Sequence, residues 1–151
     1  MSWEAVSAIT DIVGMIAVVG TLIYLASEIR QNAQALSISA LRDTTAQWNQ
    51  WSEMLATSSD LAEIVERGNV SYSDLSGAEK LRYGAYIQAF FDNAESFRSL
   101  VVDHNMNKDL KVLEAIVARR LLIPGFAAWW AENTADYSDD FVSWVGALER
   151  P

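Results

Sequence analysis

The sequence predicts an all-α protein in which one N-terminal transmembrane helix continues into a small helical bundle. The segment from Ile12 to Ser27, IVGMIAVVGTLIYLAS, holds 16 residues without a charged side chain. Beyond it, apolar residues recur three and four positions apart, which is the period of an amphipathic helix, and no segment alternates as a strand would. We therefore expect a membrane-spanning anchor at residues 1–29, a long amphipathic helical segment at 30–67 and a helical domain at 76–150.

The apolar segment reaches across a bilayer once it is extended towards the N-terminus. The stretch from Ala5 to Ser27 contains one charge, Asp11. As a helix it would be ~35 Å long, against a hydrocarbon core of ~30 Å. Trp3 and Tyr24 would lie ~32 Å apart along the helix, so that each would anchor one membrane interface. The partner of this segment would then be the lipid bilayer, and the alternative is a helix buried inside a soluble oligomer.

The basic residues predict the orientation of the span. No Lys or Arg precedes Arg30, and the next basic residue is Arg42. Because positive charge is retained on the cytoplasmic side, we expect the N-terminus outside and the C-terminal domain in the cytoplasm.

Two features of the span concern its neighbours in the membrane. Small residues recur four, three and four positions apart, and such a face lets helix backbones approach closely in lipid: Thr10, Gly14, Ala17 and Thr21. Asp11 is an acid near the edge of the apolar segment, where it would either meet water among the headgroups or serve a helix–helix or ion-related role.

The segment after the span has a heptad-like seam. No Gly or Pro interrupts the chain between Thr21 and Arg67, so we expect one helix to about Ala56 and a restart near Asp60, capped by Ser59 or Asp60. The seam residues would pack in the bundle core or between subunits of an oligomer: Leu41, Trp48, Trp51 and Leu55.

Short signals mark the later helices. Gly68 suits a helix C-cap, and Ser76 with Glu79 forms a capping-box pattern. Asn107 is expected to cap a helix that reaches about Leu122. The helix opened by Ser76 carries an apolar stripe: Tyr83, Ile87, Phe90, Ala94, Phe97 and Val101.

The C-terminal region contains a Pro-Gly pair followed by aromatic residues. Pro124 can begin a short helix that contains Phe126, Trp129 and Trp130, and Ser138 can cap the last helix. Adjacent residues point ~100° apart on a helix. We therefore expect both tryptophans to close the wide end of the bundle; the alternative is that one ring packs inward while the other lies at the membrane surface or at a partner.

Two stretches resemble a widespread, uncharacterised family of small bacterial membrane proteins. They are IVGMIAVVGTLIYLASEIRQNAQAL, at Ile12–Leu36, and PGFAAWWAEN, at Pro124–Asn133. Members open with a stretch like IVGxIAVVxTLIYLAxQIRQN and carry a Pro-Gly then Trp-Trp element before a final short helix. Glu28 stands where that pattern has Gln. The resemblance implies a bacterial inner-membrane location and provides no catalytic residues.

Composition excludes several chemistries. The net charge of −9 argues against nucleic acid as a partner, because no basic stripe exists to meet phosphates. The chain lacks cysteine and has one histidine, His104, so we expect no thiol chemistry, no metal site and no cofactor. Asp92 and Glu95 share a helix face, where two carboxylates could bind a hard cation or share a proton, and where we expect them instead to be solvated.

We therefore expect a membrane-anchored assembly protein rather than an enzyme: a homo-oligomer, or an accessory subunit of a larger membrane complex. One alternative is a module that binds an apolar small molecule or lipid in a pocket lined by Phe90, Phe91, Phe97, Phe126, Trp129 and Trp130. A second alternative is an oligomeric ion-conducting pore that uses Asp11.

Overall fold

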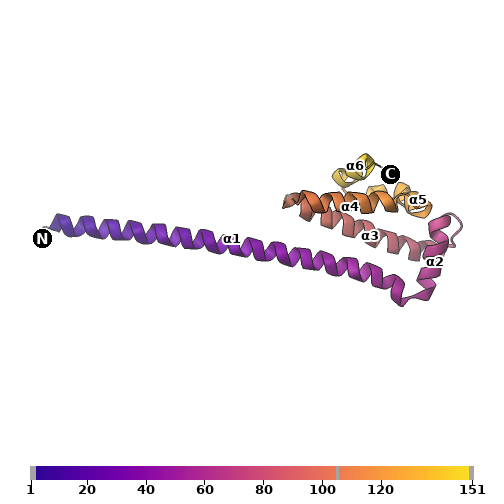
Figure 1. Ribbon diagram of the computed structural model, residues 1–151, viewed down its shortest axis with the longest axis horizontal. Coiled ribbons are helices and arrows are strands. Elements are labelled where there is room, and N and C mark those ends of the chain that lie inside the picture. The colour runs from indigo at the N-terminus through magenta and orange to yellow at the C-terminus, as the bar shows by residue number, and fades with distance from the viewer. Residues whose placement is uncertain (1–2, 105, 150–151) are drawn as a thin grey trace. The chain divides into compact units, whose positions relative to one another are not determined.

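The computed structural model describes residues 3–104 and 106–149, without the side chains of residues 4–11, 13, 34 and 107. Figure 1 shows its elements in chain order. They are α1 (Trp3–Thr57), α2 (Ser59–Val70), α3 (Gly77–Asp103), α4 (Asn107–Arg120), α5 (Pro124–Asn133), the 3₁₀ turn η1 (Thr134–Asp136) and α6 (Asp139–Ala147). The predicted all-α class is confirmed.

The chain divides into two compact units, Met1–Leu41 and Arg42–Pro151. The sequence predicted the first domain boundary earlier in the chain, after residue 29, whereas the structure has it after Leu41. We call these the N-terminal unit and the bundle unit, and describe each by itself. Within the residues whose side chains are described, no helix is both long enough and apolar enough to cross a membrane.

Helix α3 is the centre of the bundle unit. It packs against α2, α4 and α5. The predicted stripe is buried, apart from the half-buried Phe97. Tyr86 and Phe91, which lie outside that stripe, are also buried, since several helices cover α3 from different sides.

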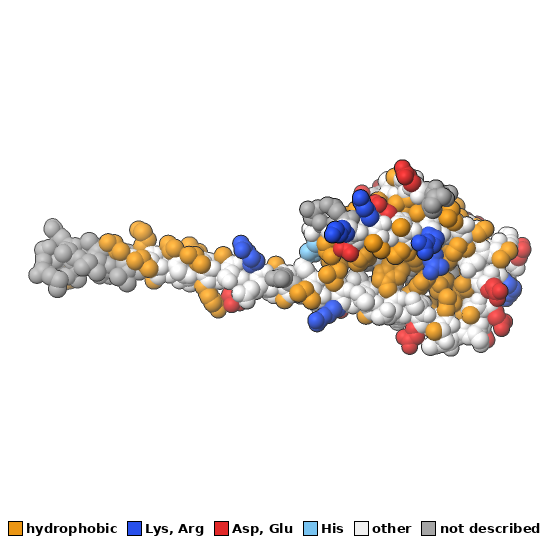
Figure 2. All heavy atoms as spheres, in the orientation of Figure 1, with side chains coloured by type: hydrophobic (Ala, Val, Ile, Leu, Met, Phe, Trp, Pro, Cys, Tyr) orange, Lys and Arg blue, Asp and Glu red, His pale blue; other side chains and the backbone are white. Residues whose placement is uncertain are grey.

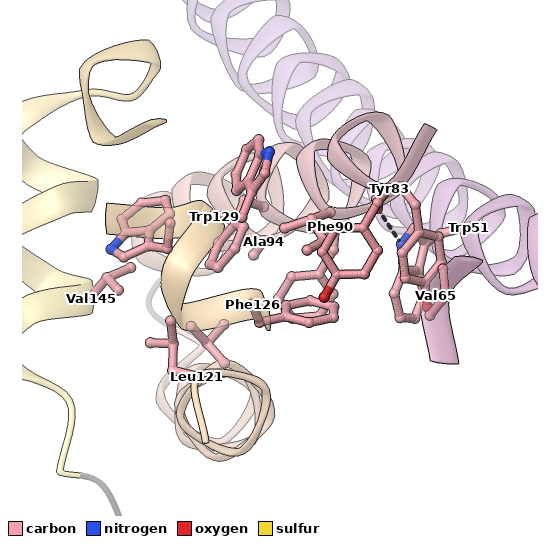
Figure 3. Close-up of a cluster of buried hydrophobic side chains, with 14 of the residues drawn as sticks. Trp51, Val65, Tyr83, Phe90, Ala94, Leu121, Phe126, Trp129 and Val145 are labelled. Carbon is pink, nitrogen blue, oxygen red and sulfur yellow. Dashed lines mark hydrogen bonds between the residues drawn. The ribbon is translucent and has the colours of Figure 1, made fainter. Parts of the chain in front are cut away.

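The C-terminal part of α1 belongs to this bundle core. The indole Nε1 of Trp51 donates a hydrogen bond to the backbone oxygen of Tyr86 at 2.8 Å, drawn in Figure 3. The two rings stack with centroids 4.8 Å apart, and Trp48 meets Phe90 edge-on at 5.4 Å. Leu55 also packs against the core. The seam from Trp48 to Leu55 is therefore occupied by the chain's own helices.

Local sequence signals locate most helix starts. Ser76 and Glu79 form the predicted capping box, in which each side chain pairs with the other residue's backbone amide. Pro124 is in the first turn of α5, and the Ser138 side chain accepts a hydrogen bond from the Phe141 amide at the start of α6. These three predictions are confirmed.

Three other predicted caps are wrong. Helix α2 is capped by Ser58, whose hydroxyl accepts from the Leu61 amide, rather than by Ser59 or Asp60. Asn107 is the first residue of α4, after the N-cap residue Met106. Gly68 does not end α2, which continues to Val70.

Gly68 lies instead where α2 meets α5. A Cβ atom on Gly68 would be 2.7 Å from the Tyr83 ring, and a Cβ on Gly125 would be 1.9 Å from the Gly68 carbonyl oxygen. Tyr83 also donates a hydrogen bond to Asn69 at 2.9 Å across this junction. Gly125 is therefore required by the close approach of the Gly68 backbone, and Gly68 by the Tyr83 ring packed against it.

Candidate functional site

The N-terminal unit exposes apolar side chains along α1. Each of the large ones between Ile12 and Ile29 has 50–69% of its area exposed: Ile12, Met15, Ile16, Val18, Val19, Leu22, Ile23, Tyr24, Leu25 and Ile29. At 100° per residue these positions occupy most of the helix circumference. A single helix cannot bury such a surface against itself, so the unit requires an apolar environment or a partner.

The predicted small-residue face lies on the remaining side of this helix. An added Cβ on Gly14 would meet nothing within 4 Å. Ala17 is exposed, and the Thr21 hydroxyl donates to the Ala17 carbonyl oxygen at 2.6 Å. This hydrogen bond within the helix uses the Thr21 hydroxyl proton, so Thr21 adds no unpaired donor to the face. The side chains of Thr10 and Asp11 lie outside the described residues.

The predicted interfacial residues are both exposed. Trp3 has 86% of its area accessible and Tyr24 has 65%. An indole or phenol ring without a protein contact is available to a membrane interface. Among the described residues of the N-terminal unit, no ring contact involves Trp3 or Tyr24.

The Trp-Trp element is buried, as expected if both rings close the end of the bundle, and the alternative in which one ring faces a membrane or a partner is wrong. Trp129 is 4% exposed, Trp130 is 8% exposed and Phe126 is fully buried. The Phe91 ring lies 5.9 Å from Trp129 and 4.4 Å from Trp130, and Trp130 also meets Tyr137 at 5.0 Å. Both rings enter the core because α5 is covered by α3 on one side and by the segment after η1 on another.

The aromatic residues suggested to line an apolar pocket fill the core instead (Figure 3). Phe90, Phe91 and Phe126 contact one another with ring centroids 5.2–6.4 Å apart. Of the suggested set, Phe90 alone borders a described pocket.

That pocket lies between α1 and α4 and has a volume of about 410 Å³. We call it the Arg120 pocket; its walls include Trp48, Trp51, Ile116, Ile123, Arg119 and Arg120. The Arg120 guanidinium carbon lies 5.1 Å from the centre of the Trp51 ring, 5.7 Å from Phe126 and 5.9 Å from Phe90. The spacing in the sequence already indicated this position. Arg120 lies three residues after Val117, and residues three apart share a helix face, so Arg120 lies on the side of α4 that faces the core.

Two acidic side chains elsewhere in the bundle have structural partners. Glu79 is paired with Arg67, whose hydrogen bond lowers the Glu79 pKa to about 2, with further help from Ser76. Glu95 accepts hydrogen bonds from the Ser138 amide at 3.1 Å and its hydroxyl at 2.6 Å, which holds the start of α6.

The Asp92–Glu95 face offers no metal site. Burial raises the Asp92 pKa, and the nearby carboxylates of Glu95 and Asp136 raise it further. The Tyr137 hydroxyl acts in the opposite direction and lowers this pKa. In the described part of the chain, no three metal-ligating side chains gather. His104 is exposed at the C-cap of α3, with Nδ1 2.9 Å from the Leu100 carbonyl oxygen, as expected for a polar residue at a helix end.

Comparison with known proteins identifies no relative. No protein-family model, no curated protein and no solved structure matches the chain. The resemblance carried by residues 12–36 and 124–133 therefore stays a prediction.

Proposed function

We propose that the chain is a membrane-anchored helical assembly protein of the bacterial inner membrane. The N-terminal unit supplies the anchor, and the bundle unit lies on the cytoplasmic side. In the membrane the chain pairs with further copies of itself or with a subunit of a larger complex. The carrying observation is the apolar surface that covers most of α1 between Ile12 and Ile29, where each large side chain that the structure describes is at least half exposed.

Lipid is the environment that suits this surface best. Each large aliphatic side chain left in water forgoes ~1.5–3 kcal/mol of burial free energy. Burial of the whole circumference in water would require protein on every side, whereas hydrocarbon covers it without further chains. The proposed span begins near Ala5. Its part from Ala5 to Val13 is supported by the sequence alone, because Ile12 is the one residue there whose side chain the structure describes.

Helix–helix contact in the membrane explains the small-residue face. Gly14, Ala17 and Thr21 lie within 60° of one another on α1, and the bulky side chains lie elsewhere on the helix. Without a hydrophobic drive between helices in lipid, close backbone packing over small residues supplies the attraction.

Membrane extraction tests the anchor. The full-length chain should stay with the membrane pellet at alkaline pH and enter solution with detergent. Ile16→Asp should release a large fraction, because Ile16 lies at the middle of the proposed span from Ala5 to Ser27 and an acid at a span centre costs ~2.5–3.5 kcal/mol. The matched control is Ala33→Asp, an exposed position on the same helix beyond the apolar segment. Release of the unmodified chain by alkali would refute the anchor.

Crosslinking in native membranes tests assembly. Gly14→Ile should abolish the crosslinked oligomer, since the larger side chain separates the backbones. Gly20→Ile is the control: an added Cβ there also meets nothing within 4 Å, and Gly20 lies about 120° away on the helix. A native chain that is strictly monomeric, or equal crosslinking of both variants, would refute assembly through this face.

A further inference from the structure

We propose that the Arg120 pocket binds a small carboxylic acid with an apolar body. The guanidinium of Arg120 would hold the carboxylate, and the walls formed by Trp48, Ile116 and Ile123 would hold the body. All these residues belong to the bundle unit, so this site is independent of the proposed membrane anchor.

Arg120 is a half-buried cation that contacts three aromatic rings. The chain has 20 acidic and 11 basic residues, yet no carboxylate of the described residues pairs with Arg120. Arg67 and Arg98, by contrast, each form a salt bridge. A half-buried cation in an acidic protein that does not use its own carboxylates is available to an external anion.

Arg120 contacts aromatic rings of the bundle core. Its guanidinium carbon lies 5.1–5.9 Å from the centres of the Trp51, Phe90 and Phe126 rings, so cation–π attraction holds the charge at the pocket wall. Two parallel N–H groups of a guanidinium match the two oxygens of a carboxylate.

The residues that border the pocket determine which uncharged body a ligand can have. Trp48 and Ile123 are half-buried and Ile116 is exposed, so that apolar area borders the pocket beside the cation. The volume of about 410 Å³ is within the ~300–1,000 Å³ range of small-molecule pockets. Asn49, at the α1 side, adds an amide that can donate to a second polar group. Figure 2 shows orange and blue side chains side by side on the visible face of the bundle unit.

Isothermal titration with matched probes tests the proposal. Naphthalene-1-acetate carries the carboxylate, and naphthalene-1-acetamide has the same body without the charge. The full-length chain, in detergent with the micelle heat subtracted, should bind the acid at least about tenfold more tightly than the amide, because charge-assisted bonds are roughly twice as strong as neutral ones. Equal affinity for the two probes, or no binding of the acid, would overturn it.

Variants test whether Arg120 causes the preference for the acid over the amide. Arg120→Gln should remove the acid preference while the amide still binds, which a collapsed pocket would not allow. Arg82→Gln, at an exposed position of α3, should leave both affinities unchanged. Ile116→Trp keeps the guanidinium and fills the pocket, so it should weaken both probes about tenfold or more. An acid preference that survives Arg120→Gln contradicts the assignment.

A phosphate probe decides between anion types. 1-Naphthyl phosphate has a similar body and a larger negative charge. It should bind no more tightly than the carboxylate when Arg120 alone holds the anion, because one guanidinium edge supplies one bidentate contact. Arg119→Gln, which removes the other cation of the pocket wall, should therefore leave the acid preference and this order unchanged. Tighter binding of the phosphate would replace the carboxylic acid with a phosphate ester as the ligand class.

Discussion

The junction of α2 and α5 provides the sharpest test of the fold. Gly125→Ala would place a Cβ atom 1.9 Å from the Gly68 carbonyl oxygen and 2.3 Å from the Tyr83 hydroxyl. The first of these neighbours is backbone, so no side-chain rotation relieves the clash. Helix α5 must move by more than 1 Å, since Cβ atoms essentially never approach within 3.0 Å of another heavy atom.

The cost follows from overpacking. Insertion of a methyl group into a tightly packed contact costs ~1–3 kcal/mol, and a backbone clash belongs at the upper end of that range. The bundle unit has about 110 residues. With ~2.1 cal/mol/K of unfolding entropy per residue, a loss of ~2–3 kcal/mol lowers Tm by ~9–13 °C.

Thermal unfolding followed by tryptophan fluorescence measures this cost, because Trp51, Trp129 and Trp130 report the bundle core. Gly146→Ala is the matched control. It lies in α6, an added Cβ there meets nothing within 4 Å, and Ala is the better helix former, so Tm should rise by a few degrees. A Gly125→Ala protein that melts at or above the temperature of the unmodified chain would refute the close helix contact.

Three further perturbations probe the bundle. Trp51→Phe removes the donor to the Tyr86 carbonyl oxygen and should lower the free energy of unfolding by ~1–3 kcal/mol in denaturant titration, while Trp3→Phe, at an exposed position, should change it little. Ser138→Ala removes the cap of α6 and should cost ~1 kcal/mol by the same measurement; an unchanged midpoint would contradict the capping role. Because the folded-state pKa of Glu79 is lowered from 4.5 to about 2, its contribution is present above pH 4.5 and is lost as pH falls towards 2. Glu79→Gln should therefore flatten the pH dependence of Tm in that window, by a small amount because the pair is exposed to solvent.

The sequence alone determined the helical class and the features that depend on neighbouring residues in the chain. The capping box at Ser76, the first-turn proline at Pro124 and the cap at Ser138 each act within four residues, so their effect is readable from local spacing. The uncharged segment from Ile12 to Ser27 is likewise visible without coordinates, and so is the apolar surface that motivates the proposed anchor.

Only the tertiary structure decided which elements meet. Gly68 looked like a helix end because glycine is common there, but it is required by the Tyr83 ring of α3, which would lie 2.7 Å from an added Cβ atom. Trp129 and Trp130 both lie inside because two different elements cover α5, which the angle between adjacent residues cannot reveal. Arg120 has the same origin: residues from α1, α3 and α5, far apart in the chain, bring three aromatic rings under one guanidinium. Local spacing encodes helices and caps, whereas a pocket is a property of the surfaces that helices present to one another.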